Sequence, residues 1–181
     1  MKVIKNSLSE NLTERCLEEI KQLQNDPVWR SSSICWPEWL KNGISGSCLI
    51  VDSNKEVKKQ ILDQIQSYLP KTSNDISIMF YVWQPGSGMS KHLDSAYKFA
   101  ATIYLNSYWN IEWGGNFLYY NKTNIDWNTP ENEYMYDHDN WKLIVPEYRT
   151  MVVNTDKMLH MVTPISSFVP ELRYTIQIFA S

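Results

Sequence analysis

The segment from Tyr81 to Asp94 reads YVWQPGSGMSKHLD and decides how the rest of the chain is interpreted. It begins as an apolar strand and turns at Pro85. It ends on a histidine and an aspartate two residues apart, His92 and Asp94. Side chains two residues apart on an extended chain point to the same face. The pair can therefore bind one metal ion together, although an isolated pair of this kind is a weak motif.

Two later residues, His160 and Arg173, strengthen that interpretation. Two imidazoles and one carboxylate form the facial triad that holds non-haem Fe(II) and leaves positions open for other ligands. A distant strand of a folded-over β architecture can supply His160 as the third ligand. The guanidinium of Arg173 is a planar, permanently charged group that suits a carboxylate. The set suggests an iron enzyme that also binds a dicarboxylic acid.

Further motifs surround these residues in a definite order. ATIYLN ends at Asn106, EWGGNFL ends at Leu118, NTDKMLHMV contains His160, and LRYTIQIF contains Arg173. Together with the HxD motif, this order resembles the 2-oxoglutarate/Fe(II)-dependent dioxygenase superfamily, particularly its prolyl-hydroxylase-like branch. The resemblance covers residues 76 to 179, which is most of the chain.

The resemblance implies a role for each site residue. His92, Asp94 and His160 would be the iron ligands. Arg173 would bind the distal carboxylate of 2-oxoglutarate, and the phenol of Tyr104 would hydrogen-bond the same group. The implied cofactors are Fe(II), the co-substrate 2-oxoglutarate and O2, in a reaction that releases succinate and CO2. Halogenating relatives replace the carboxylate with a small residue, so Asp94 favours a hydroxylase. One departure is the step from His160 to Arg173, which is longer than in many prolyl hydroxylases; some of these use Lys there.

Apolar periodicity predicts the secondary structure. Two runs at helical spacing each follow a candidate N-cap, residues 12–23 after Ser9 and residues 57–69 after Asn54. A strand is expected at 47–51 between the two runs, and further strands at 76–84, 99–105, 117–120, 150–153, 159–162 and 172–180. We therefore expect a mainly β fold with N-terminal helices, a double-stranded β-helix (jelly roll) supported by amphipathic helices. One domain should span residues 1–181, with helical support over about 1–75 and the jelly-roll core over about 76–181.

Alternation along the last strand separates two faces. One face carries Arg173, Thr175, Gln177 and Phe179, and the other carries Tyr174, Ile176 and Ile178. We expect the apolar face to pack against the helices or the second sheet, and the polar face to line a cavity. A buried guanidinium is costly unless a carboxylate meets it. Arg173 therefore binds 2-oxoglutarate or, alternatively, pairs with a protein acid such as Glu171 or Glu147.

Composition limits the remaining classes of function. The chain of 181 residues is 43% hydrophobic and 20% charged, which is ordinary for a globular protein. Its formal net charge of −3 makes nucleic acid an unlikely partner. Cys16, Cys35 and Cys48 have no CxxC spacing and suggest reduced thiols. The polar N-terminus and the lack of a long apolar run predict a cytoplasmic protein without a membrane segment.

Two other functions remain open at this point. A cupin-like metalloenzyme would use the triad without 2-oxoglutarate, and a non-catalytic β-sandwich module would bind carbohydrate or protein through aromatic residues. For an oxygenase, a peptidyl side chain or a small metabolite is the expected substrate. The segment 121–145 is a long loop, which is either a substrate lid or an exposed insertion. The carbon that is oxidised and the oligomeric state are not predicted.

Overall fold

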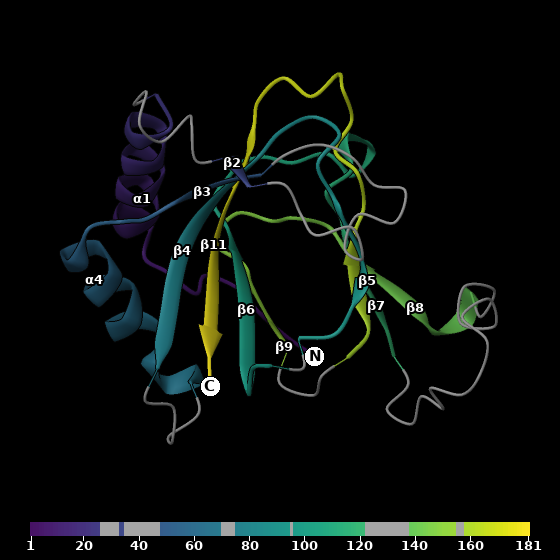
Figure 1. Cartoon of the computed structure of the whole chain (residues 1–181), viewed down its shortest axis with the longest axis horizontal. Coiled ribbons are helices and arrows are strands. Elements are labelled where there is room, and N and C mark those ends of the chain that lie inside the picture. Colours follow the sequence, from purple (N-terminus) through teal and green to yellow (C-terminus); the bar gives the residue numbers. More distant parts are fainter. Residues whose placement is uncertain (26–32, 35–47, 70–74, 95, 122–137, 155–157) are drawn as a thin grey trace.

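The computed structural model describes residues 1–25, 33–34, 48–69, 75–94, 96–121, 138–154 and 158–181. Its strands form two antiparallel sheets (Figure 1). The larger sheet has seven strands in the order β1-β9-β6-β11-β4-β3-β2, and the smaller has four in the order β5-β10-β7-β8. Helices α1 and α4 lie on the side of the larger sheet that faces away from the smaller one (Figure 1).

The larger sheet is organised around the last strand. Its strands are β1 (Lys2–Ile4), β2 (Ser33–Ile34), β3 (Cys48–Val51), β4 (Ile76–Trp83), β6 (Phe99–Tyr104), β9 (Met151–Asn154) and β11 (Arg173–Ala180). Strand β11 pairs with β4 along its whole length on one side and with β6 on the other. The central position of β11 places the residue that begins it, Arg173, deep inside the protein.

The smaller sheet joins segments that are far apart in the sequence. Its strands are β5 (Met89–His92), β7 (Phe117–Tyr120), β8 (Trp141–Ile144) and β10 (His160–Val162). Strand β10 lies between β5 and β7, and the register with β5 shifts between His160 and Val162. Three short 3-10 helices occur at η1 (Gln66–Tyr68), η2 (Ile111–Trp113) and η3 (His138–Asn140).

The two helices begin at the residues that the sequence indicated. In α1 (Glu10–Leu23), the Ser9 side chain accepts a hydrogen bond from the Leu12 N–H, and in α4 (Lys55–Ile65) Asn54 does the same for Val57. Such N-caps satisfy donors that the first turn leaves unpaired. The apolar stripes of both helices join the outer face of the larger sheet in one core, in which Ile20, Ile61, Phe80, Ile103, Ile176 and Ile178 are all fully buried.

The predicted elements are largely confirmed, with differences at the ends and edges. The six strands expected after residue 76 all form, each within one residue of the predicted bounds. Four short strands were not among those expected: β1, β2, β5 and β8. Strand β8 lies within the predicted long loop, so the interpretation of 121–145 as a loop throughout is wrong; its residues 122–137 lie outside the described part. The mainly β class with two supporting helices is confirmed. No helix in the described ranges is both long and apolar enough to cross a bilayer.

Candidate metal and carboxylate sites

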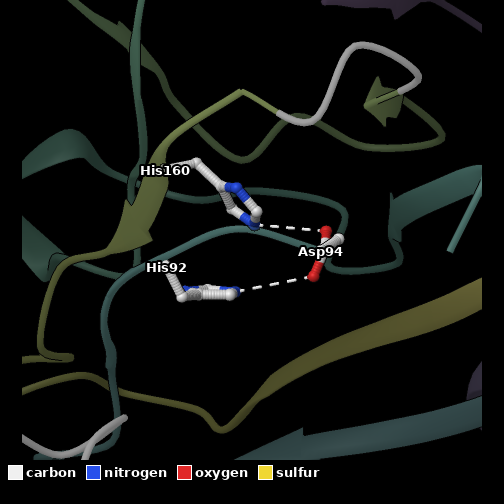
Figure 2. A group of neighbouring side chains, drawn as sticks. All are labelled: His92, Asp94 and His160. Carbon is white, nitrogen blue, oxygen red and sulfur yellow. Dashed lines mark ion pairs between the residues drawn. The ribbon is translucent and has the colours of Figure 1, made fainter. Parts of the chain in front are cut away.

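Strand pairing in the smaller sheet brings the three predicted metal ligands together. His160 on β10 is the direct register partner of His92 at the end of β5, and Asp94 follows two residues later. Nε2 of His92 lies 3.7 Å from Oδ1 of Asp94, and Nε2 of His160 lies 3.4 Å from Oδ2. Figure 2 shows both imidazoles and the carboxylate turned toward one point. Their ligand atoms all lie within 4.8 Å of one another, which is a spacing that can hold a metal ion.

The backbone fixes which nitrogen of each imidazole faces that point. Nδ1 of His92 lies 2.7 Å from the Ser90 carbonyl, and Nδ1 of His160 lies 2.8 Å from the Met158 carbonyl. A carbonyl oxygen can only accept, so each Nδ1 carries a proton, and in the neutral form of each imidazole Nε2 then keeps the lone pair. Metal-binding histidines are commonly oriented by such a bond from the other ring nitrogen.

Electrostatics keep His92 neutral. Burial, followed by the neighbouring His160, lowers the pKa of His92 to about 4. An imidazole binds a metal only in its neutral form. At neutral pH, therefore, His92 needs no deprotonation before it can act as a ligand.

Asn154 and Phe117 support His160 from outside the triad. The Asn154 side-chain oxygen accepts the Met158 N–H (3.2 Å), so it holds the residue whose carbonyl orients His160. The ring of Phe117 stacks on the His160 imidazole with centroids 5.0 Å apart and planes 19° apart. The sequence did not indicate either residue as part of the site. Phe117 reaches His160 through the pairing of β7 with β10, and Asn154 acts through the backbone of Met158.

Arg173 is a buried cation with no ion-pair partner in the described part of the chain. Its side chain is 1% exposed, and its Nε and Nη1 have no hydrogen-bond partner within the described residues. The alternative partner Glu147 forms an ion pair with Lys5 instead, and no described ion pair involves Arg173. Burial lowers the pKa of the guanidinium. An anion beside it would stabilise the charged form.

Two aromatic rings enclose the Arg173 guanidinium. Its central carbon lies 4.9 Å from the Trp83 ring centroid and 5.1 Å from that of Tyr104. Such cation–π contacts offset part of the cost of burying the charge. The Tyr104 hydroxyl is also buried without a hydrogen-bond partner in the described structure, and burial raises its pKa. The predicted pair Arg173 and Tyr104 therefore presents neighbouring unsatisfied donors.

The two glycines of the EWGGNFL motif fit tightly beside this pair. Gly114 and Gly115 both have positive φ, at 70° and 63°. A Cβ on Gly115 would lie 2.9 Å from Cδ of Arg173, and one on Gly114 would lie 2.0 Å from the Pro164 carbonyl oxygen. Only glycine, which has no Cβ, allows both the positive φ and this close approach. The motif thus leaves room for the Arg173 side chain.

A cavity of about 490 Å³ lies between the two sheets and contains the triad. Its wall from the larger sheet includes Trp83, Thr102 and Gln177, and the wall from the smaller sheet includes His92 and His160. Arg173 and Tyr104 are not on the cavity wall. Trp83 connects the two sites, because its ring lines the cavity and also lies over the Arg173 guanidinium. Its position opposite Arg173 in the β4–β11 register was not predicted.

Comparison with known proteins identifies the fold. No protein-family model matches the chain, and no curated protein sequence matches it significantly. Among solved structures, a Pseudomonas putida prolyl-4-hydroxylase is similar with a TM-score of 0.69 at 16% identity, over 99% of this chain and 90% of that one. A Trichoplax adhaerens prolyl hydroxylase in complex with a hypoxia inducible factor peptide fragment has a TM-score of 0.65 at 14% identity, over 99% and 82% of the two chains.

A third structure, an oxidoreductase of the 2OG-Fe(II) oxygenase family from Burkholderia pseudomallei, has a TM-score of 0.59 at 15% identity, over 99% and 82% of the two chains. The chain has the fold of these oxygenases. This confirms the jelly roll expected from the sequence. Within that oxygenase fold, the short motifs of this chain converge on one cavity, although overall identity to each of these structures is 16% or less.

Proposed function

We propose that the protein is a non-haem Fe(II) dioxygenase that couples decarboxylation of 2-oxoglutarate to hydroxylation of a substrate. The observation that carries this proposal is the buried Arg173, which adjoins the cavity containing the triad and has no anionic partner among the described residues. A metal triad alone would also suit a cupin-like enzyme. The unsatisfied guanidinium favours a carboxylate ligand, because buried charges are rarely left unpaired.

His92, Asp94 and His160 would hold Fe(II). Two imidazoles and one carboxylate match the donor set of this class of iron site. Bound iron would supply the redox chemistry that couples the oxidative decarboxylation of 2-oxoglutarate, with O2 as the oxidant, to substrate hydroxylation. The carbonyls of Ser90 and Met158 keep both Nε2 atoms directed at the metal position.

Arg173 and Tyr104 would bind the distal carboxylate of 2-oxoglutarate. The guanidinium offers two parallel donors to a carboxylate, and the phenol adds a third. The surrounding rings exclude water, which strengthens this charge-assisted contact. The protein's contribution is therefore to orient the co-substrate between a metal position and a fixed cation.

The primary substrate would be a peptidyl side chain or a small metabolite. The Trichoplax adhaerens structure contains a peptide fragment, which supports a peptide for that protein and makes peptides the first class to test here. We place the enzyme in the cytoplasm, in one domain over residues 1–181. The buried, unpaired thiols of Cys16 and Cys48 support a reducing compartment.

Succinate release tests the proposal. Purified protein with Fe(II), 2-oxoglutarate and O2 should form succinate, and the rate should rise when a panel of peptides and metabolites contains a substrate. Omission of Fe(II) or of 2-oxoglutarate should abolish the product, and His160→Ala is the matched inactive control. Absence of Fe(II)-dependent succinate with every panel member and without substrate would reject the proposal.

A further inference from the structure

The cavity wall outside the triad carries no ionic side chain among the described residues. Its members there are aromatic, aliphatic or neutral polar: Tyr81, Trp83, Met89, Leu93, Ala96, Tyr97, Ala100, Ala101, Thr102, Phe117, Val152, Asn154, Val162, Gln177 and Phe179. A free ammonium or carboxylate of a substrate would find no counter-ion on this wall. The wall therefore suits a substrate whose reacting part is uncharged.

Only three of these residues carry a polar group that is not on an aromatic ring: Thr102, Asn154 and Gln177. Asn154 already accepts the Met158 N–H and lies beside His160. Thr102 and Gln177 lie on adjacent strands of the same larger sheet as Asn154, as direct register partners on β6 and β11. With Asn154, they form the polar part of the wall opposite His92 and His160.

The Gln177 amide is held rigidly and is only partly used. Its Oε1 accepts the Thr102 hydroxyl proton (2.8 Å), and its Nε2 donates to Thr175 Oγ1 (3.1 Å). Thr175 is fixed in turn, because the Trp83 indole N–H donates to the same oxygen (2.9 Å). A primary amide has two donors and two acceptor lone pairs. One N–H and one lone pair of Gln177 therefore have no partner within the described residues.

An apolar contact surface adjoins this amide. Phe179 follows Gln177 on the same face of β11, and its ring packs against Tyr97 with centroids 4.6 Å apart. Tyr97 is 37% exposed, so the ring pair extends from the cavity to the protein surface. A ligand that reaches Gln177 could thus place an apolar group beside these rings.

We propose that Gln177, oriented by Thr102 and Thr175, binds an uncharged amide of the primary substrate and selects amide-bearing substrates over free amino acids. The unused N–H would donate to the substrate carbonyl, and the unused lone pair would accept the substrate N–H. This inference rests on the proposed oxygenase function and names the chemical group that its substrate must present. The same group occurs in a peptide backbone and in a small amide metabolite.

Matched probes test the proposal by calorimetry on anaerobic protein loaded with Fe(II) and 2-oxoglutarate. The probes are N-acetyl amino acid N-methylamides with uncharged side chains, the matching O-acetyl hydroxy acid methyl esters, in which oxygen replaces both N–H groups, and the free amino acids. An ester keeps the carbonyl but replaces the N–H with an oxygen. For the side chain that binds best, we expect the amide to bind about 10-fold more tightly than the ester. The amide N–H can donate to Oε1 of Gln177, whereas the ester oxygen would place a lone pair against the lone pair of Oε1. The free amino acid should bind more weakly than both.

Variants then locate the selectivity. Gln177→Leu keeps the approximate size of the side chain but removes its amide, so the preference for amide over ester should fall to about 2-fold or less. Thr102→Val should reduce it partly, because Oε1 loses the donor that orients it. Ile178→Val, on the opposite face of the same strand, should keep the full preference. A longer peptide around the best residue that binds more tightly than the capped residue would identify a peptide substrate, and equal binding would identify a small amide.

Three results would overturn the proposal: no capped amide binds, free amino acids bind more tightly than the amides, or Gln177→Leu keeps the wild-type preference. Titration of Fe(II) and 2-oxoglutarate is a separate readout. If both bind but amide selectivity is absent, the proposed oxygenase function stands and this inference fails. If neither binds, the proposed function itself fails.

Discussion

The two faces of β11 differ in how completely their residues are satisfied. On the outer face, Tyr174, Ile176 and Ile178 pack into the core beneath α1 and α4. On the inner face, two nitrogens of Arg173 lack hydrogen-bond partners among the described residues, and the Gln177 amide makes two of its four possible hydrogen bonds there. Apolar side chains are satisfied by packing alone, whereas these inner polar groups need a ligand. Because side chains alternate between the faces of a strand, β11 places residues that stabilise the core on one face and residues that could bind a ligand on the other.

The largest effect is expected for His160, a predicted metal ligand that lies across the cavity from the inner face of β11. His160→Ala should reduce Fe(II) affinity by more than about 100-fold, because even residues that only orient a ligand are worth 10- to 100-fold. Iron-dependent succinate release should fall below detection. The thermal stability of the metal-free protein should change little, since the imidazole lines a cavity. Full activity in this variant would show that the triad is assigned incorrectly.

The next largest effect is expected when the charge of Arg173, on the inner face of β11, is removed. Arg173→Ala should raise the KM for 2-oxoglutarate by about 30-fold to several thousand-fold, since the loss of one partner of a buried charge pair costs about 2–5 kcal/mol. Arg173→Lys should be intermediate, because it keeps the charge but loses the planar donor pair. Initial rates against 2-oxoglutarate concentration give these values.

Two comparisons control that prediction. Tyr104→Phe removes a single hydrogen bond and should raise the KM by only about 2- to 10-fold. Fe(II) affinity should stay near the wild-type value in both variants, because neither residue is a predicted ligand. An unaltered KM in Arg173→Ala would favour the cupin-like alternative, in which Arg173 is structural.

The outer face should give the opposite pattern. Ile178→Ala should lower the free energy of unfolding by about 2–5 kcal/mol, because the side chain is fully buried and leaves a cavity. The KM for 2-oxoglutarate should not change at a temperature where the variant is folded. Urea denaturation and initial rates on the same preparation make the comparison. A large KM change with little loss of stability would show that the two faces are not independent.

Gly115→Ala should give the smallest effect and should act through Arg173. A left-handed backbone costs an alanine about 1–2 kcal/mol, and the new Cβ would press on the Arg173 side chain. We expect a several-fold rise in the KM for 2-oxoglutarate. In an Arg173→Ala background, the same substitution should leave that KM nearly unchanged. Equal rises in both backgrounds would mean that Gly115 acts independently of Arg173.

Much of this arrangement was predictable because it depends on local periodicity. The caps Ser9 and Asn54, the two helices and the alternation of β11 follow from sequence spacing, and the structure confirms them. The HxD spacing, with the order of the later motifs, predicted that His92, Asp94 and His160 would meet. Short edge strands such as β1 and β8 were missed, since three or four residues carry little periodic signal.

The rest depends on pairing between distant strands, which spacing does not encode. The alignment of His92 with His160 requires the register of β5 and β10, and the position of Trp83 over Arg173 requires that of β4 and β11. The carbonyl of Ser90 is part of the site only because of its position, as any residue there carries one. The sequence predicted which residues form the site, and the structure shows how their side chains are oriented.

The proposed oxygenase function is tested most directly by anaerobic titration of the wild-type protein with Fe(II) and 2-oxoglutarate, followed by visible absorption. We predict a weak charge-transfer band that requires both components, disappears in His160→Ala and needs a much higher 2-oxoglutarate concentration in Arg173→Ala. Fe(II) binding that 2-oxoglutarate does not alter would contradict this function and indicate a cupin-like metalloenzyme. Failure to bind either component would contradict it too, and would indicate a non-catalytic binding module.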